Sequence, residues 1–316
     1  MSELHRSFEH LASDLRAAAN PERAPQMAAY LKDQFPVLGV SSPERRTLQK
    51  PFMTAARTAA PDDVLDVADL CWHADERQFQ HVGADLLRVR AKTFQAADLD
   101  RLHTFIVHKS WWDTVDALAA HPVGTLVMRY PELGAVMDVW IDDDNIWVAR
   151  AAILHQLRYK DAVNEARLFS SVEKRAADTE FFIRKALGWA LRDYARVAPD
   201  AVRDFVNSHQ EALSGLTKRE ALKHLQMTTK YSASRLLTTF VFGRKVAICH
   251  HIGDAVTERY SWSVAWSKVR NPMPRRNSSV QFRKTRNMAK KRPRSEGQQS
   301  LRHNRSADES FAFNEY

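Results

Sequence analysis

The spacing of apolar residues over residues 1–225 is the feature that most constrains the fold. They recur at i, i+3, i+4 and i+7, as at Ile183, Ala186, Leu187 and Ala190, which places them on one face of a helix. Glycines are few there, and no convincing run alternates apolar with polar residues as a half-buried strand would. The pattern therefore predicts a body built from helices.

Helix start signals recur between these segments. Pro43 and Pro61 are each followed by acidic residues, which is typical of a first helical turn. The spacing predicts helices over 3–18, 23–35, 43–58, 62–73, 76–92, 97–108, 111–120, 123–129, 132–140, 144–158, 162–177, 180–196, 199–207 and 217–225. Many short helices with short joins predict antiparallel pairs stacked in series, hence an all-α solenoid of degenerate HEAT-like repeats. A compact helical bundle is the alternative.

Charge is distributed unevenly along the chain. The formal net charge of the 316 residues is +9, but residues 226–316 net +12 and residues 1–225 net −3. We therefore expect a helical domain at 1–225 and a basic, atypical, partly disordered tail at 226–316. Arg235 to Val256 is compatible with a helix or a strand pair, whereas 271–304 has a disorder composition. An appended binding tail, a fusion and a shifted reading frame would each explain the change.

Several classes of function are disfavoured by the composition. Cys71 and Cys249 are too few for a disulfide framework, which favours a reducing, cytoplasmic compartment. The sequence shows neither a secretory signal nor an apolar run long enough to span a membrane. Phosphate-binding, dinucleotide-binding and zinc motifs are absent as well, so we expect neither a cofactor nor a metal.

The segment from Lys109 to Asp116 is the first functional lead. Ser110 and Asp113 have the spacing of a capping box, which assigns Ser110 as a helix N-cap and leaves Asp116 without a capping role. Asp116 lies four residues after Trp112, so an indole and a carboxylate share one helix face. A carboxylate in that setting is costly unless a cation faces it. The segment therefore predicts a cationic partner for Asp116.

Basic residues mark the next two lead segments. Arg150 interrupts an otherwise apolar helical run. The predicted helix over 180–196 carries a basic stripe with an aromatic residue in it, at i, i+4, i+7 and i+11: Lys185, Trp189, Arg192 and Arg196. Arg158 and Lys160 extend the basic pattern from the preceding helix pair. Such a surface suits phosphates together with a base or a sugar.

Four segments, in this order, resemble the AlkD family of DNA alkylation-repair glycosylases: 35–46, 110–116, 145–160 and 181–194. The resemblance covers roughly residues 5–225. It implies an all-helical solenoid of HEAT-like repeats whose concave face holds duplex DNA. It also implies an enzyme that excises positively charged N3- and N7-alkylpurines.

The resemblance assigns roles to individual residues. Asp116 matches the catalytic aspartate, and Trp112 and Trp189 match the tryptophans that flank the lesion. Arg150 matches the arginine that grips a phosphate. Further DNA contacts are expected from the resemblance and the basic pattern: Arg158, Arg192, Tyr30, Lys185 and Lys160. Ser41 stands where some members have glutamine, a departure that bears on a DNA contact at that corner.

The implied chemistry agrees with these residue types. An N3- or N7-alkylated purine is already a good leaving group, and positive charge grows on the deoxyribose as the glycosidic bond breaks. Asp116 would stabilise that charge and orient the attacking water. Trp112 and Trp189 would offer aromatic faces to the cationic lesion and sugar. The positive charge of the lesion and sugar would also be the cation that Asp116 needs. The resemblance implies that the lesion stays in the duplex, and the lack of a lysine nucleophile implies excision without strand cleavage.

Two other functions fit a helical repeat. A non-catalytic binder of DNA structures has no use for Asp116 beside Trp112, and a protein-interaction scaffold predicts apolar or acidic faces rather than a stripe of arginine and tryptophan. We therefore expect the partner to be double-stranded DNA containing alkylated purines. We expect no membrane association, no obligate protein partner and a monomeric chain.

Overall fold

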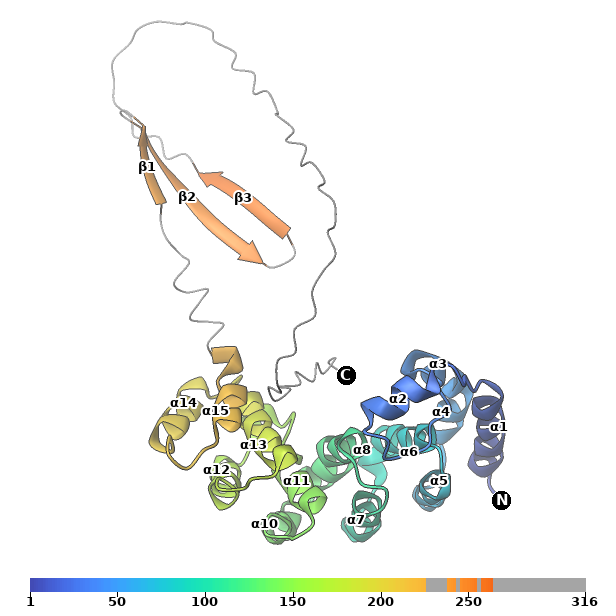
Figure 1. Cartoon of the computed structure of the whole chain (residues 1–316). Helices are drawn as coiled ribbons and strands as arrows, with labels where there is room; N and C mark the ends of the chain where they lie inside the picture. The colour runs from blue at the N-terminus through green and yellow to red at the C-terminus, as the bar shows by residue number, and fades with distance from the viewer. Residues whose placement is uncertain (226–237, 243–244, 255–256, 264–316) are drawn as a thin grey trace, which may run out of the picture. The chain divides into compact units, whose positions relative to one another are not determined.

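The structure is a computed structural model that describes residues 1–225, 238–242, 245–254 and 257–263. The chain divides into two units, Met1–Ser263 and Val264–Tyr316, and every described residue belongs to the first unit. Helices make up the described chain as far as residue 225, and strands follow (Figure 1).

Most of the predicted helices are present within one to three residues of their expected ends. In chain order they are α1 (Glu3–Ala17), α2 (Ala24–Tyr30), α3 (Ser42–Leu48), α4 (Lys50–Ala56), α5 (Pro61–His73), α6 (Arg77–Arg90), α7 (Leu99–Val107), α8 (Trp112–Leu118), α9 (Gly124–Arg129), α10 (Gly134–Trp140), α11 (Ile146–Leu154), α12 (Glu165–Lys174), α13 (Phe181–Tyr194), α14 (Pro199–Ser208) and α15 (Gly215–Ala221). Short 3-10 turns and a π-helix over Ala119–Val123 lie between some of them.

Four predicted helices differ more from the structure. The helix expected over 144–158 is α11, which ends at Leu154, and the helix expected over 217–225 is α15, which ends at Ala221. The other two differ for local reasons. The helix expected over 43–58 is two helices, α3 and α4, because Pro51 at the start of α4 cannot donate a backbone hydrogen bond to the turn before it. The helix expected over 23–35 ends at Tyr30, because Lys32 and Asp33 take positive φ angles of 58° and 55°. Left-handed residues of this kind end a helix.

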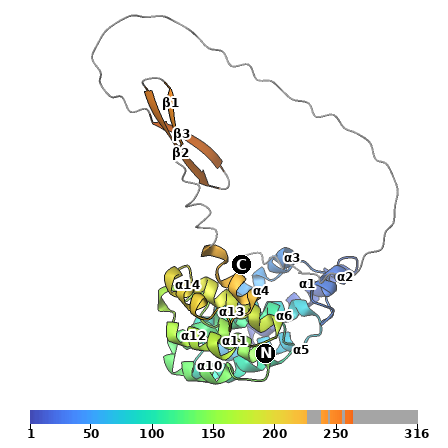
Figure 2. The same cartoon turned by 60° about the vertical axis from the view of Figure 1, so that its left-hand side comes forward.

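Two layers of helices run through the helical body in chain order. One layer, which we call the site layer, is α6, α8, α11, α13 and α15, each in contact with the next. The other, the backing layer, consists of α5, α7, α10, α12 and α14, and each of these contacts the site-layer helix that follows it. Figure 2 shows α10, α12 and α14 stacked along one side of α11 and α13. This stacking of pairs confirms the all-α solenoid for the helical body and rules out the compact bundle.

The hydrophobic core lies between the two layers and continues from pair to pair. Phe79, Phe105, Val115, Leu154 and Leu187 are each at most 2% exposed. Burying one side chain of this kind contributes about 1.5–3 kcal/mol. The core therefore fixes the spacing of the site-layer helices, which carry the polar residues described below.

Three strands follow the helices: β1 (Thr238–Phe242), β2 (Lys245–Asp254) and β3 (Thr257–Ser263). They form an antiparallel sheet in the order β1-β2-β3, in which Phe242 opposes Lys245 and Asp254 opposes Thr257. The stretch from Arg235 to Val256 thus contains strands, the second of its two predicted possibilities, and β3 extends the sheet further along the chain. The disorder predicted for 271–304 falls outside the described residues, and the domain boundary at residue 225 stays a prediction.

Candidate active site

The start of α8 differs from the sequence prediction. Trp111 is the N-cap residue, and no side-chain hydrogen bond in the described part of the chain caps the helix there. Ser110 Oγ instead donates to the Ile106 carbonyl at 2.6 Å. The capping box predicted for Ser110 and Asp113 is therefore wrong. Lys109, with a φ of 47°, turns the chain so that Ser110 closes the end of α7 rather than starting α8.

Asp113 instead joins α8 to α6 through a buried ion-pair cluster. Arg77 is fully buried, and its Nη2 and Nε donate to the Asp113 carboxylate at 2.5 and 3.1 Å. His81 Nε2 lies 2.7 Å from the same carboxylate. Arg77 also donates to the Lys109 carbonyl at 2.7 Å and to Thr114 Oγ1 at 2.8 Å. The cluster fixes the first turn of α8, and with it the direction in which Asp116 projects.

The protonation of this cluster follows from its contacts. Burial alone would raise the pKa of the Asp113 carboxyl, but the hydrogen bond with His81 and the charge of Arg77 hold that pKa well below its usual range. Burial lowers the pKa of His81, with Asp113 opposing the shift. Asp113 is therefore an ionised structural carboxylate.

Asp116 forms a bidentate ion pair with Arg150 of α11. Arg150 Nε donates to Asp116 Oδ1 at 2.7 Å and Arg150 Nη2 to Oδ2 at 2.8 Å. Arg150 is 1% exposed and also donates through Nη1 to the Phe182 carbonyl of α13. The cationic partner predicted for Asp116 is thus present in the protein, and it is a side chain rather than a ligand.

The Asp116 carboxyl is subject to opposing influences. Burial raises its pKa above the usual value, the Arg150 guanidinium and its hydrogen bonds oppose that rise, and the nearby Asp113 charge adds to it. The side chain keeps 16% of its surface exposed. Asp116 is accordingly held in one orientation by Arg150 while part of it stays accessible.

Trp189 of α13 lies next to this ion pair. The Arg150 Cζ atom is 5.4 Å from the centroid of its ring, within the range of a cation–π contact. Lys185 Nζ and Arg192 Cζ are each 5.8 Å from the same ring. Arg150 therefore bridges Asp116 on α8 and Trp189 on α13, which are 73 positions apart in the sequence.

Trp112 lies on α8 one turn before Asp116, and Tyr30 at the end of α2 packs against it. The two rings are 5.7 Å apart at 82°, an edge-to-face arrangement. Tyr30 keeps half of its surface exposed. Tyr30 thus contacts Trp112, Asp116 follows one turn later on α8, and Arg150 links Asp116 to Trp189. We call this set of five residues the aromatic–acid row.

The remaining predicted DNA contacts are divided between two places. Lys185 and Arg192 donate to the carboxylate of Glu220 on α15, each at 2.7 Å. Arg158 and Lys160 are exposed in the turn after α11, with φ angles of 77° and 55°. Both residues are therefore available at the surface of the protein.

Ser41 has a structural role. It caps α3 in a capping box with Glu44, whose carboxylate accepts from the Ser41 backbone N–H at 2.9 Å and from Ser41 Oγ at 2.7 Å. The hydrogen bonds from Ser41, together with Arg23, lower the pKa of Glu44 to about 2. Ser41, the position at which the sequence departs from the resemblance, therefore serves as a helix cap.

Sequence reasoning missed the residues that hold the row in place: Arg77, His81 and Glu220. Arg77 and His81 lie at i and i+4 on α6, a spacing that does place them on one face, but nothing in the sequence indicates that Asp113 lies opposite. Glu220 lies in a predicted helix whose packing register the spacing leaves open. These partners depend on the register between helices.

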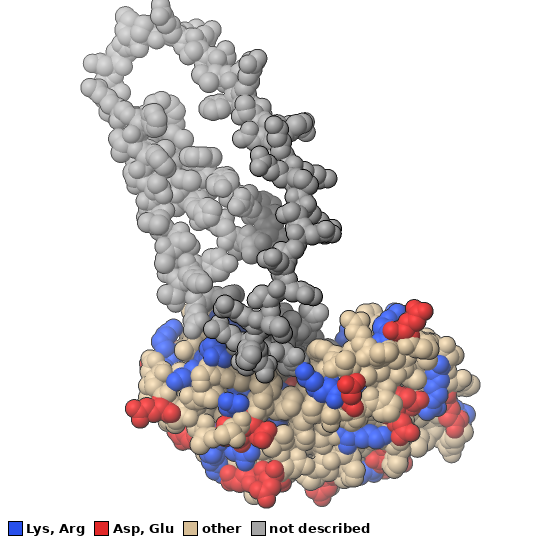
Figure 3. All heavy atoms as spheres, viewed as in Figure 1, with Lys and Arg blue, Asp and Glu red and all other residues tan. Residues whose placement is uncertain are grey.

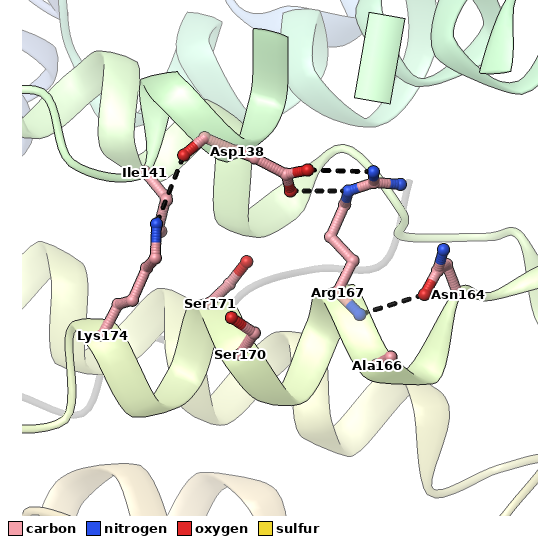
Figure 4. A pocket seen from close by; sticks show the side chains of 8 residues that line it. All are labelled: Asp138, Ile141, Asn164, Ala166, Arg167, Ser170, Ser171 and Lys174. Atoms are coloured by element: carbon pink, nitrogen blue, oxygen red, sulfur yellow. Dashed lines mark hydrogen bonds and ion pairs between the residues drawn. The ribbon is translucent and has the colours of Figure 1, made fainter. Parts of the chain in front are cut away.

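The groove between α10 and α12 does not suggest a second active site. Figure 3 shows basic and acidic side chains interspersed over one face. A groove of about 280 Å³ lies between α10 and α12, and Asp138 in it forms a bidentate pair with Arg167 (Figure 4). Lys174 in the same groove pairs with Asp142. The charges of this groove are therefore neutralised within the protein.

The described part of the chain shows no feature of a metal site or of a membrane span. That part contains no group of three or more His, Cys, Asp or Glu arranged to hold a metal ion. It likewise contains no helix that is long and apolar enough to cross a bilayer.

These features define a class: a helical-repeat protein in which a partly exposed aspartate is paired with a buried arginine beside half-buried tryptophans. The chain belongs to the family described as DNA alkylation repair enzyme, which matches over residues 11–225. A structure described as a predicted DNA alkylation repair enzyme from Enterococcus faecalis is 31% identical, with a TM-score of 0.61 over 66% of this chain and 96% of that chain. The resemblance to this family is thereby confirmed.

Another solved structure, described as AlkD2 from Streptococcus mutans, is 19% identical, with a TM-score of 0.45 over 63% of this chain and 98% of that chain. No curated protein matches the chain. Family membership supports a role as an enzyme in the repair of alkylated DNA, with DNA as its substrate. The lesion, the monomeric state and the cytoplasmic location stay predictions.

Proposed function

We propose that the protein is a DNA glycosylase that excises cationic N3- and N7-alkylpurines, such as 3-methyladenine and 7-methylguanine, from duplex DNA without cleaving the strand. The observation that carries the proposal is the meeting of Asp116, Arg150 and Trp189 from three different helices. A scaffold for protein partners has no need of a carboxylate that a buried arginine orients next to an indole. Catalysis at a developing cation does need one.

In the proposed reaction the bond between the purine nitrogen and C1′ of the deoxyribose breaks, and its electron pair leaves with the base. The departing base becomes neutral, so no acid has to protonate it. The positive charge on the sugar is stabilised by the Asp116 carboxylate, as carboxylates do at the oxocarbenium-like transition states of glycoside hydrolysis. Water then adds to C1′ and releases one proton to the surrounding solvent. Asp116, which is partly exposed, is the proposed group that orients this water.

Besides the predicted phosphate contact, Arg150 has a second role in this scheme, because it fixes the catalytic carboxylate of Asp116. Its hydrogen bonds keep both Asp116 oxygens in place and favour the ionised carboxylate. Three of its five N–H groups are used by Asp116 and the Phe182 carbonyl. The phosphate contact of Arg150 stays a prediction, and it would use the other two N–H groups. The proposed contacts with the DNA backbone are the exposed residues Arg158 and Lys160.

Release of 7-methylguanine from an end-labelled duplex tests the proposal. Incubation with the protein should produce a site that breaks on heating, while unheated strands stay intact because no lysine nucleophile cleaves them. An undamaged duplex and a sample without protein are the controls. Strand breaks before heating would contradict the monofunctional mechanism, and the absence of heat-labile sites would contradict excision of this lesion.

A non-catalytic binder of DNA is the second candidate, and one observation favours it. Asp116 already has a partner in Arg150, so it has a structural task even without a substrate. This candidate predicts duplex binding without base release. The release assay, run beside a binding assay on the same duplex, separates the two functions.

A further inference from the structure

The last helix of the body, α15, packs unusually closely on α13. A Cβ atom at Gly188 would lie 2.5 Å from Glu220 Cβ and 2.9 Å from the Thr217 carbonyl oxygen, so only glycine permits this approach. Thr217 Oγ1 also donates to the Arg184 carbonyl at 3.1 Å. A glycine inside a helix costs about 1 kcal/mol relative to alanine. The close contact explains why a glycine is present at position 188, and it brings Glu220 over the middle of α13.

Glu220 sits at the centre of the basic stripe predicted from the sequence. Its carboxylate accepts from Lys185 Nζ and Arg192 Nη1, each at 2.7 Å, and from the Trp189 indole N–H at 3.2 Å. The Glu220 side chain is 13% exposed. Burial raises the pKa of Glu220, but Lys185 and Arg192 lower it by a larger amount, so that the pKa lies below the usual value. Glu220 is thus an ionised carboxylate with a partner on each side.

This arrangement has two consequences for Trp189. The indole is held by its N–H in a single orientation, because the carboxylate that accepts this N–H is itself fixed by Lys185 and Arg192. An anion that accepts the N–H also polarises the ring and makes its face more electron-rich. An electron-rich face attracts a cation more strongly. Glu220 also reduces the net charge of the basic stripe, because its negative charge cancels that of one of the two cations, Lys185 and Arg192, that flank the indole.

We propose that Glu220 is a positioning residue that orients and polarises Trp189 toward the cationic lesion, and that α15 is therefore part of the site. The inference rests on the proposed function, in which Trp189 faces the lesion. Glu220 itself does not touch the DNA in this scheme. It acts through the indole, and it limits how strongly Lys185 and Arg192 attract undamaged backbone.

Two variants at this position separate charge from reach. Glu220→Gln keeps the length of the side chain and removes its charge, whereas Glu220→Asp keeps the charge and shortens the reach to the indole. Glu211→Gln is the matched control, because Glu211 is exposed in the turn between α14 and α15 and its loss changes the net charge equally. Each variant is compared with wild type in thermal melting, binding to undamaged duplex and single-turnover release of 7-methylguanine.

Glu220→Gln should bind undamaged duplex more tightly than Glu211→Gln, with a salt dependence steeper by about 0.9 in log–log terms for each added phosphate contact. It should release the lesion about 5- to 30-fold more slowly, the range expected when a cation–π contact weakens by one to two kcal/mol. Glu220→Asp should keep the wild-type salt dependence and yet release the lesion more slowly as well. Slower release in both variants, with tighter binding in Glu220→Gln alone, is the signature of positioning.

Wild-type release rates in both Glu220 variants would overturn the inference. Weaker duplex binding together with earlier melting in both would also overturn it, because that pattern belongs to a purely structural carboxylate. Failure of the proposed function gives a different result from failure of this inference, because the wild-type protein itself would then release no 7-methylguanine.

Discussion

At the scale of single residues, Asp116 has to be ionised to stabilise a growing positive charge. Excision should therefore fall as the pH drops through the pKa of Asp116. Burial raises that pKa and Arg150 opposes the rise, so removal of the cation should raise it further. Arg150→Gln should move the acid limb of the single-turnover pH profile to higher pH, and Arg150→Lys should move it less. An unchanged acid limb in Arg150→Gln would show that the ion pair with Arg150 does not control the pKa of Asp116.

Asp113 is expected to matter for stability rather than chemistry. Its pKa is lower in the folded than in the unfolded protein, so its ionised form stabilises the fold above the unfolded value of about 3.9. That contribution is lost as the pH falls through the folded pKa. Asp113→Asn should cost about 3–5 kcal/mol, because it leaves Arg77 buried without its anion. Urea unfolding at neutral pH measures this cost, with exposed Asp144→Asn as control, and a loss below about 1 kcal/mol contradicts the role.

Spacing along one helix predicted part of this residue-scale arrangement. Trp112 and Asp116 share a face because they are one turn apart, and the need of Asp116 for a cation followed from its setting. The sequence did not indicate which cation pairs with Asp116. Arg150 lies 34 residues away, and its reach to Asp116 depends on how α11 packs on α8. The same applies to Arg77, which determines what Asp113 does.

At the scale of elements, the contact between α13 and α15 allows a sharp comparison of two glycines. Gly188→Ala gains helix propensity but forces a Cβ against Glu220 and the Thr217 backbone. Overpacking of this kind costs about 1–3 kcal/mol. At Gly215 in α15, the nearest group to an added Cβ is the end of Arg219, 3.6 Å away. Gly215→Ala should therefore be neutral or stabilising. Thermal melts of both variants test the contact, and equal melting temperatures would contradict it.

Helix existence was predictable from periodicity, while helix ends depended on single backbone angles. The apolar spacing identified nearly every helix of the body. It did not reveal the turn at Lys109, whose positive φ makes Trp111 rather than Ser110 the N-cap of α8. Nor did it reveal the break at Gln49 between α3 and α4, although Pro51 in the sequence carried that signal.

At the scale of the whole molecule, charge separates the helical body from the segment after it. Residues 1–225 net −3 and residues 226–316 net +12. Truncation after Leu225 should leave lesion excision intact and reduce affinity for undamaged duplex at low salt, because salt screens sequence-independent attraction strongly. Comparison of residues 1–225, residues 1–263 and the full chain in melting and excision tests this. If 1–225 aggregates or melts far earlier while 1–263 is sound, the strands belong to the folded body.

The most direct test of the account is the single-turnover release of 7-methylguanine by wild type and Asp116→Asn, measured beside their affinity for the same duplex. The amide keeps the shape of the carboxylate but not its charge. We expect release to slow by about 100- to 1000-fold, as for the loss of one preorganised electrostatic group, while duplex affinity stays close to wild type. Release at the wild-type rate in Asp116→Asn would contradict the central claim that this carboxylate performs the chemistry.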